Sequence, residues 1–119
     1  MPDYGLFIGW HLPVRGRERA SIQVFTEAME YYGRLQQQGE IESVEPVLLE
    51  SHGGDLGGFI LLRGAREALS RLRTSDEFVR LLTRANLVVE SLGVVGAYVG
   101  DAFQPQMERY QQQLDELAP

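Results

Sequence analysis

Apolar residues gather in four short runs, and two longer segments with helical periodicity separate them. The predicted strands are residues 4–12, 41–52, 56–63 and 94–100. The predicted helices are residues 16–38 and a region over 65–92 in two pieces, in which apolar positions recur three and four residues apart. Gly53-Gly54-Asp55 predicts a hairpin turn between the two middle strands. Pro46 cannot donate to a sheet ladder, so the second strand is expected either at an edge or with a bulge at this residue.

Local signals predict where the helices begin and end. Gly39 suits a left-handed cap after the first helix. Thr74 precedes Glu77 at the spacing of a capping box, which predicts a break and a restart within the second helical region. Pro105 suits the first turn of a last helix over 104–118. The apolar stripe of that helix consists of Met107, Tyr110, Leu114 and Leu117.

The order β-α-β-β-α-β predicts an α+β protein with a ferredoxin-like fold, formed by residues 1–119 as a single domain. Right-handed crossovers would place both long helices on one face of a four-stranded antiparallel sheet. The strands are apolar on both faces, with Leu6 and Ile8 alternating with Phe7 in the first one. Large exposed apolar patches mark interfaces, so we expect a homodimer in which a second copy covers the open face. The last helix is a second contact surface, on its own protomer or on the partner.

Composition excludes several classes of chemistry. The 119 residues carry a net charge of −6, which argues against nucleic acid or an anionic membrane as partner. There is no cysteine and no lysine, so thiol nucleophiles and Schiff bases are absent. Two histidines are too few for a multi-histidine metal site, and we expect no cofactor. No targeting signal and no long apolar run is visible, which predicts a cytoplasmic protein.

The two histidines are the candidate general bases. His11 lies beside Trp10 at the end of the first strand, and His52 lies two residues after Glu50, which would put the side chains of Glu50 and His52 on one face of the second strand. Together with Asp55, Glu50 and His52 could hold a divalent metal or act as an acid–base pair. The favoured interpretation is a solvated hairpin end without metal, because this spacing is no known ligand motif.

Four strand residues could line a ligand pocket, although aromatic side chains more often fill cores. They are Trp10, Phe59, Arg63 and Tyr98.

The element order resembles that of the dimeric α+β barrel superfamily, in which two ferredoxin-like protomers pack sheet against sheet. Within it, residues 31–39, which begin Tyr31-Tyr32-Gly33-Arg34-Leu35, and the segment Ser75-Asp76-Glu77-Phe78 are similar to the YCII-related branch. That branch tends to have a histidine near the place of Ala28 and a proline at the place of Glu77. Asp76 and Phe78 match, so the resemblance implies the fold and the dimer but lacks the histidine of the branch's presumed catalytic pair.

A second comparison within the superfamily concerns haem. Its small haem-degrading monooxygenases use an asparagine, a tryptophan and a helical histidine. Trp10 and Asn86 are present here, but neither long helix carries a histidine, which argues against haem ligation.

Three functions remain open at this point. The leading one is a dimer that binds a small molecule without a catalytic constellation. The second is a cofactor-independent enzyme acting on a small organic acid, with His11 or His52 as general base and an arginine to hold the carboxylate. The third is a structural or protein-interaction module, which needs only the dimer.

Overall fold

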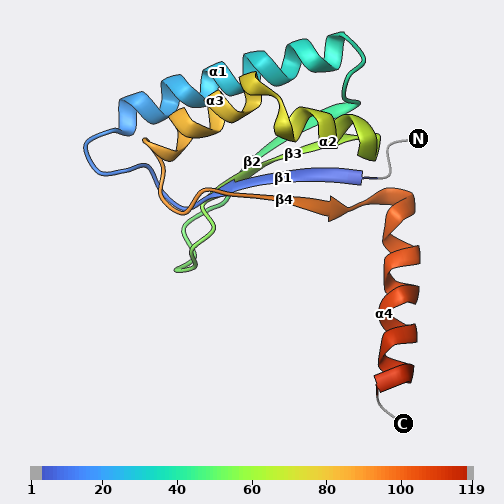
Figure 1. Cartoon of the computed structure of the whole chain (residues 1–119). Helices are drawn as coiled ribbons and strands as arrows, with labels where there is room; N and C mark the ends of the chain where they lie inside the picture. Colours follow the sequence, from blue (N-terminus) through green and yellow to red (C-terminus); the bar gives the residue numbers. More distant parts are fainter. Residues whose placement is uncertain (1–3, 118–119) are drawn as a thin grey trace.

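A computed structural model describes residues 4–117 and shows one four-stranded sheet with three helices on one face (Figure 1). The strands are β1 (Tyr4–Trp10), β2 (Ser43–Leu48), β3 (Gly58–Gly64) and β4 (Gly93–Tyr98). The helices are α1 (Glu18–Gln37), α2 (Arg66–Thr74), α3 (Asp76–Asn86), the short 3-10 turn η1 (Gly100–Ala102) and α4 (Phe103–Leu117). The strand order is β2-β3-β1-β4, and all neighbours are antiparallel. The predicted ferredoxin-like topology is confirmed, with β2 and its Pro46 at an edge.

The connection between β2 and β3 is longer than the sequence predicted. The prediction of a tight turn at 53–55 was wrong. β2 ends at Leu48 and β3 begins only at Gly58, so residues 49–57 form a loop. The end of β1 holds the base of this loop, since the Gly57 amide donates to the carbonyl oxygen of Trp10 at 2.7 Å. A Cβ at Gly57 would lie 1.8 Å from the carbonyl oxygen of His11, so only glycine allows this approach.

The break between α2 and α3 lies where it was expected, but Thr74 is not the cap. The Ser75 hydroxyl accepts from the Phe78 amide at 3.4 Å and donates to the Leu72 carbonyl at 2.8 Å. Thr74 is the last residue of α2, and its hydroxyl bonds back to carbonyl oxygens of its own helix. The predicted left-handed cap at Gly39 is confirmed by its φ of 77°.

The core lies between the sheet and helices α1, α2 and α3. Alternate strand residues point into it, among them Leu6, Ile8, Ile60 and Leu62. The rings of Tyr32 and Phe78 meet there with centroids 6.4 Å apart, and both side chains are fully buried. Burial raises the pKa of the Tyr32 hydroxyl well above its usual value.

The other sheet face has no helix against it, and α4 projects away on that side (Figure 1). The strand positions between the core residues form this open face, which carries Phe7, Val47, Phe59, Leu61 and Val95. None of the residues of α4 is buried, and Leu117 of its apolar stripe is 81 % exposed. The protomer therefore leaves two apolar surfaces uncovered.

Candidate functional site

A cavity of about 660 Å³ lies between the sheet, α1, α3 and loop 49–57, and it is partly open to solvent. This volume falls in the usual range for a small-molecule pocket. The inner wall is apolar and comes from strands and helices together: Ile8, Val24, Ala28, Ile60, Leu81 and Ala85. Ala28 of α1 and Ala85 of α3 are the small residues in this wall. They leave space because an alanine fills less of the layer between helix and sheet than a leucine would.

Trp10, the single tryptophan of the chain, lines this cavity at the end of β1. Its indole meets the ring of Phe25 of α1 edge to face, with centroids 6.1 Å apart. The aromatic pair forms one side of the cavity. It supplies a flat apolar surface against which a ligand could stack.

His11 also lines the cavity, just beyond the end of β1. Its backbone amide donates to the Glu90 carbonyl at 2.9 Å, which fixes the chain at this point. The ring Nδ1 is enclosed by protein and has no hydrogen-bond partner among residues 4–117. A buried lone pair costs less than a buried N–H without an acceptor, which favours the tautomer with its proton on Nε2. Nε2 is then the atom with which His11 can bind a ligand.

His52 lies in the loop, and the loop occupies both of its ring nitrogens. Nδ1 accepts from the Gly54 amide at 3.3 Å, and Nε2 lies 2.9 Å from the Leu56 carbonyl oxygen. Because an amide only donates and a carbonyl only accepts, the ring is neutral with its proton on Nε2. His52 therefore clips the loop together, and neither nitrogen is free to act as a general base in this conformation.

Glu50, His52 and Asp55 all line the cavity, but they do not form a metal site. Within residues 4–117 no group of three or more histidine, aspartate or glutamate side chains is close enough to hold an ion. The expectation that Glu50 and His52 share a strand face was wrong, because both lie in loop 49–57.

The four pocket candidates from the strands are not brought together. Trp10 lines the cavity, whereas Phe59 and Arg63 belong to the open face of the sheet. Tyr98 lies at the far end of the sheet, edge to face with Tyr4 at 5.8 Å. Strand spacing alone could not separate these positions, because the sequence did not show which face the helices cover. The cavity wall that α1 and α3 contribute was not predicted from the sequence.

Comparisons with known proteins agree with this architecture. No protein-family model and no curated protein matches the chain by sequence. Among solved structures it is similar to a dimeric protein of unknown function and ferredoxin-like fold from Bacteroides fragilis, with a TM-score of 0.60 and 14% identity over 80% of this chain and 94% of that one. A hypothetical Arabidopsis thaliana protein gives 0.60 and 14%, over 85% and 91%.

A third similar structure is SnoaB, a cofactor-independent oxygenase from Streptomyces nogalater, with a TM-score of 0.54 and 12% identity over 86% of this chain and 98% of that one. At these identities the likeness establishes the ferredoxin-like fold.

None of the helices within residues 4–117 is both long and apolar enough to cross a membrane.

Proposed function

We propose that this protein binds a small, largely apolar molecule in the cavity between its sheet and helices, without catalysing a reaction. The cavity itself is the observation that carries the proposal, because a volume of about 660 Å³ with an apolar wall would otherwise be costly to leave unfilled. The proposal includes a single domain, a homodimer and a cytoplasmic location. The absence of cysteine fits a cytoplasmic location.

Kinship to the YCII-related branch is part of the same proposal, and its matching residues support a binding role. Tyr32 and Phe78 of the matching segments pack in the core. Ala28, near the place of that branch's histidine, lines the cavity. Asp76 points elsewhere, since its carboxylate pairs with Arg80 at 3.1 Å on the exposed side of α3. Where the branch would have a histidine, this chain has open apolar space.

Trp10 offers a direct test of binding. Titration with Nile red, a neutral apolar dye, should quench the Trp10 fluorescence saturably and transfer energy to the dye. Ala85→Phe, which fills the cavity from α3, should abolish the effect. Thr83→Phe, at an exposed position of the same helix, is the matched control and should leave it unchanged. Equal binding by both variants would place the dye elsewhere and refute the proposal.

The second candidate is a cofactor-independent enzyme in which His11 acts as general base. The unpartnered Nδ1 favours it, because no protein group fixes the ring proton on one nitrogen: in the other tautomer, with that proton on Nδ1, Nε2 can take up a proton from a ligand. SnoaB, which shares the fold, is described as a cofactor-independent oxygenase. His52 is the weaker base of the two, since the loop engages both its nitrogens.

The catalytic candidate can be tested with an apolar ketone. With 2-tetralone in heavy water, the protein should accelerate exchange of the protons beside the carbonyl, and His11→Ala should remove the acceleration while binding persists. An exchange rate equal to that of buffer would leave the binding function alone standing.

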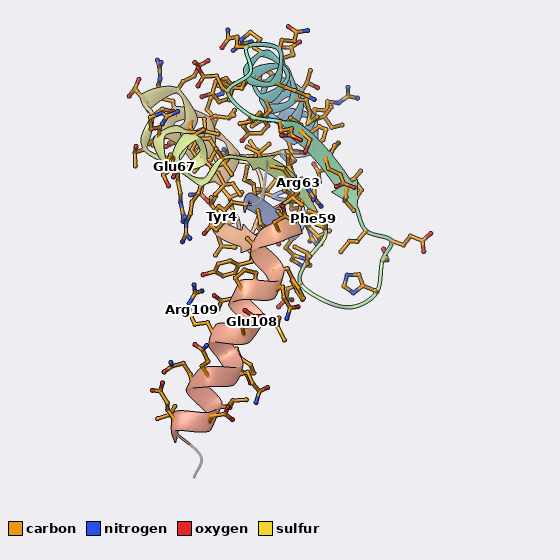
Figure 2. The ribbon with its side chains drawn as sticks, turned by 90° about the vertical axis from the view of Figure 1, so that its right-hand side faces the viewer. Tyr4, Phe59, Arg63, Glu67, Glu108 and Arg109 are labelled. Atoms are coloured by element: carbon orange, nitrogen blue, oxygen red, sulfur yellow. The ribbon has the colours of Figure 1, made fainter. Side chains whose placement is uncertain are left out.

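Self-association is the remaining part of the proposal, with a second copy on the open face. Packed sheets lie about 10 Å apart. The 15 residues of α4 span about 22 Å, and the helix leaves the sheet on its open side (Figure 1). In a sheet-to-sheet dimer α4 would therefore pass beside the partner's sheet edge. In Figure 2, Glu108 and Arg109 lie on α4 well away from the sheet, where Phe59 and Arg63 lie, so a partner has room against the helix.

The area fits such a dimer. Five apolar side chains of α4 are each about half exposed or more: Phe103, Met107, Tyr110, Leu114 and Leu117. Together they present on the order of 500 Å². With the open face added, each copy could bury about the 800 Å² of a standard interface. A purely structural module would need this dimer alone, and the Nile red experiment separates that function from ligand binding.

A further inference from the structure

We propose that the ligand of the cavity carries no negative charge, and that the site rejects carboxylates. The inference rests on the proposed binding function and names the class of molecule bound: an apolar body with a neutral hydroxyl or carbonyl end. It revises the sequence-based alternative of a small organic acid, which required an arginine beside the ligand.

The charged side chains that line the cavity are all of one sign. Glu50 and Asp55 line it from loop 49–57, and both are exposed at its mouth. No arginine lines the cavity within residues 4–117, and the chain contains no lysine. The positive end of the α1 dipole is already matched by Glu18 in the first turn of the helix. Among the side chains that line the cavity, an anion would therefore meet two carboxylates and no arginine.

Several arginines near the helices are already engaged elsewhere. Arg17 donates to the Leu87 carbonyl at 3.1 Å, and Arg84 makes two bonds of 2.9 Å to Glu27. Arg63 lies on the open face, with the sheet between it and the cavity. Arg17 and Arg84 could neutralise a carboxylate in the cavity only by breaking these hydrogen bonds, and Arg63 is on the wrong side of the sheet.

Desolvation makes the absence of a counter-charge decisive. An ionised carboxylate loses its water on entering an apolar cavity and needs a paired cation to compensate. Repulsion from Glu50 and Asp55 adds to that cost, and so does the net charge of −6 over the whole chain. A neutral oxygen needs only one hydrogen bond, and Nε2 of His11 can donate it.

The test compares two ligands of the same length, 1-decanol and decanoate, at about pH 8, where the acid is ionised. Titration calorimetry and Trp10 fluorescence should both give a dissociation constant at least about tenfold lower for decanol. The double variant Glu50→Gln/Asp55→Asn should strengthen decanoate binding more than decanol binding, and so reduce the ratio of the two dissociation constants. Ala85→Phe should weaken decanol binding, and Thr83→Phe should not.

The outcomes separate the two proposals. Decanoate binding as tight as that of decanol, at the site blocked by Ala85→Phe, would overturn the inference and leave the binding function intact. Binding of neither ligand would contradict the binding function and this inference with it. A third outcome is that the double variant Glu50→Gln/Asp55→Asn leaves the preference for decanol as large as before. That result would contradict the repulsive role of the two loop carboxylates and assign the selectivity to desolvation alone.

Discussion

The ring of Phe7 stacks on the ring of Phe59, with centroids 5.0 Å apart, on the sheet face that no helix covers. Phe7 pairs across the strands with Leu61 and Val95, so the aromatic pair lies at the centre of an apolar patch. A Cβ at Gly9 would lie 2.6 Å from the Phe7 ring, so the ring occupies the space that a side chain at this position would need. An apolar surface of this kind is suited to packing against another sheet.

The first prediction tests whether that face joins two copies. Phe59→Glu should convert the dimer to a monomer, because it places a charge without a partner at the centre of the interface. Light scattering should then give the 13.4 kDa chain mass, against twice that value for the unchanged protein. Circular dichroism should stay the same, since Phe59 is outside the core. Thr83→Glu, on the helical side, is the control and should remain dimeric. A dimer that survives Phe59→Glu would show that the copies join elsewhere.

The second prediction distinguishes two neighbouring residues at the break between α2 and α3. Ser75→Ala removes the hydroxyl that accepts from the Phe78 amide and should lower the free energy of unfolding by about 1 kcal/mol. Thr74→Ala is the matched control and should change it by less than about 0.5 kcal/mol. Urea unfolding of both variants measures the difference. A larger loss for Thr74→Ala would restore the capping position that the sequence first indicated.

Most of the fold could be predicted from periodicity, and the errors have local causes. Thr74 and Ser75 both suit a cap, and only the backbone geometry decides between them. The second strand was predicted to reach His52 because Leu48 and Leu49 continue its apolar run. In the structure β2 ends at Leu48, and both leucines line the cavity. The cavity lies on the sheet face that the helices cover. The sequence did not show which face this is, because β1 carries apolar residues on both faces.

The candidate site was harder to predict for the same reason. Trp10 and His11 were expected at the end of the first strand; β1 ends at Trp10, and both residues line the cavity. The function of His52 as a loop clip depends on contacts with Gly54 and Leu56, which no residue spacing encodes. The charge of the cavity depends on where each arginine side chain points, which becomes visible only with the tertiary structure.

The third prediction concerns acid stability. The hydrogen bonds from Arg84 hold the pKa of Glu27 below its usual value of 4.5, although burial acts in the opposite direction. Because this pKa is lower in the folded state, the pair stabilises the protein above the unfolded pKa, and the stabilisation is lost as pH falls through the folded pKa. Glu27→Gln should therefore reduce the drop in melting temperature between about pH 7 and about pH 3. Glu30→Gln, exposed on the same helix, is the control, and equal pH profiles for both variants would contradict the prediction.

The last prediction concerns α4, whose apolar stripe was expected to be buried. The protomer leaves Leu114 42 % exposed, so full burial of this side chain requires a second copy. If the partner buries it fully, Leu114→Ala should weaken the dimer by about 2–5 kcal/mol. Removal of the chain from Gln104 onward should weaken it further, while Nile red still binds.

A double-mutant comparison locates the contact of Leu114. In the monomeric Phe59→Glu background, Leu114→Ala should change the free energy of unfolding by less than about 0.5 kcal/mol, because the side chain then has no partner to lose. In the dimer its effect should appear in full and should depend on protein concentration. A cost of equal size in both backgrounds would mean that α4 folds back onto its own open sheet face. An effect near zero in both would mean that the helix stabilises neither the protomer nor the dimer.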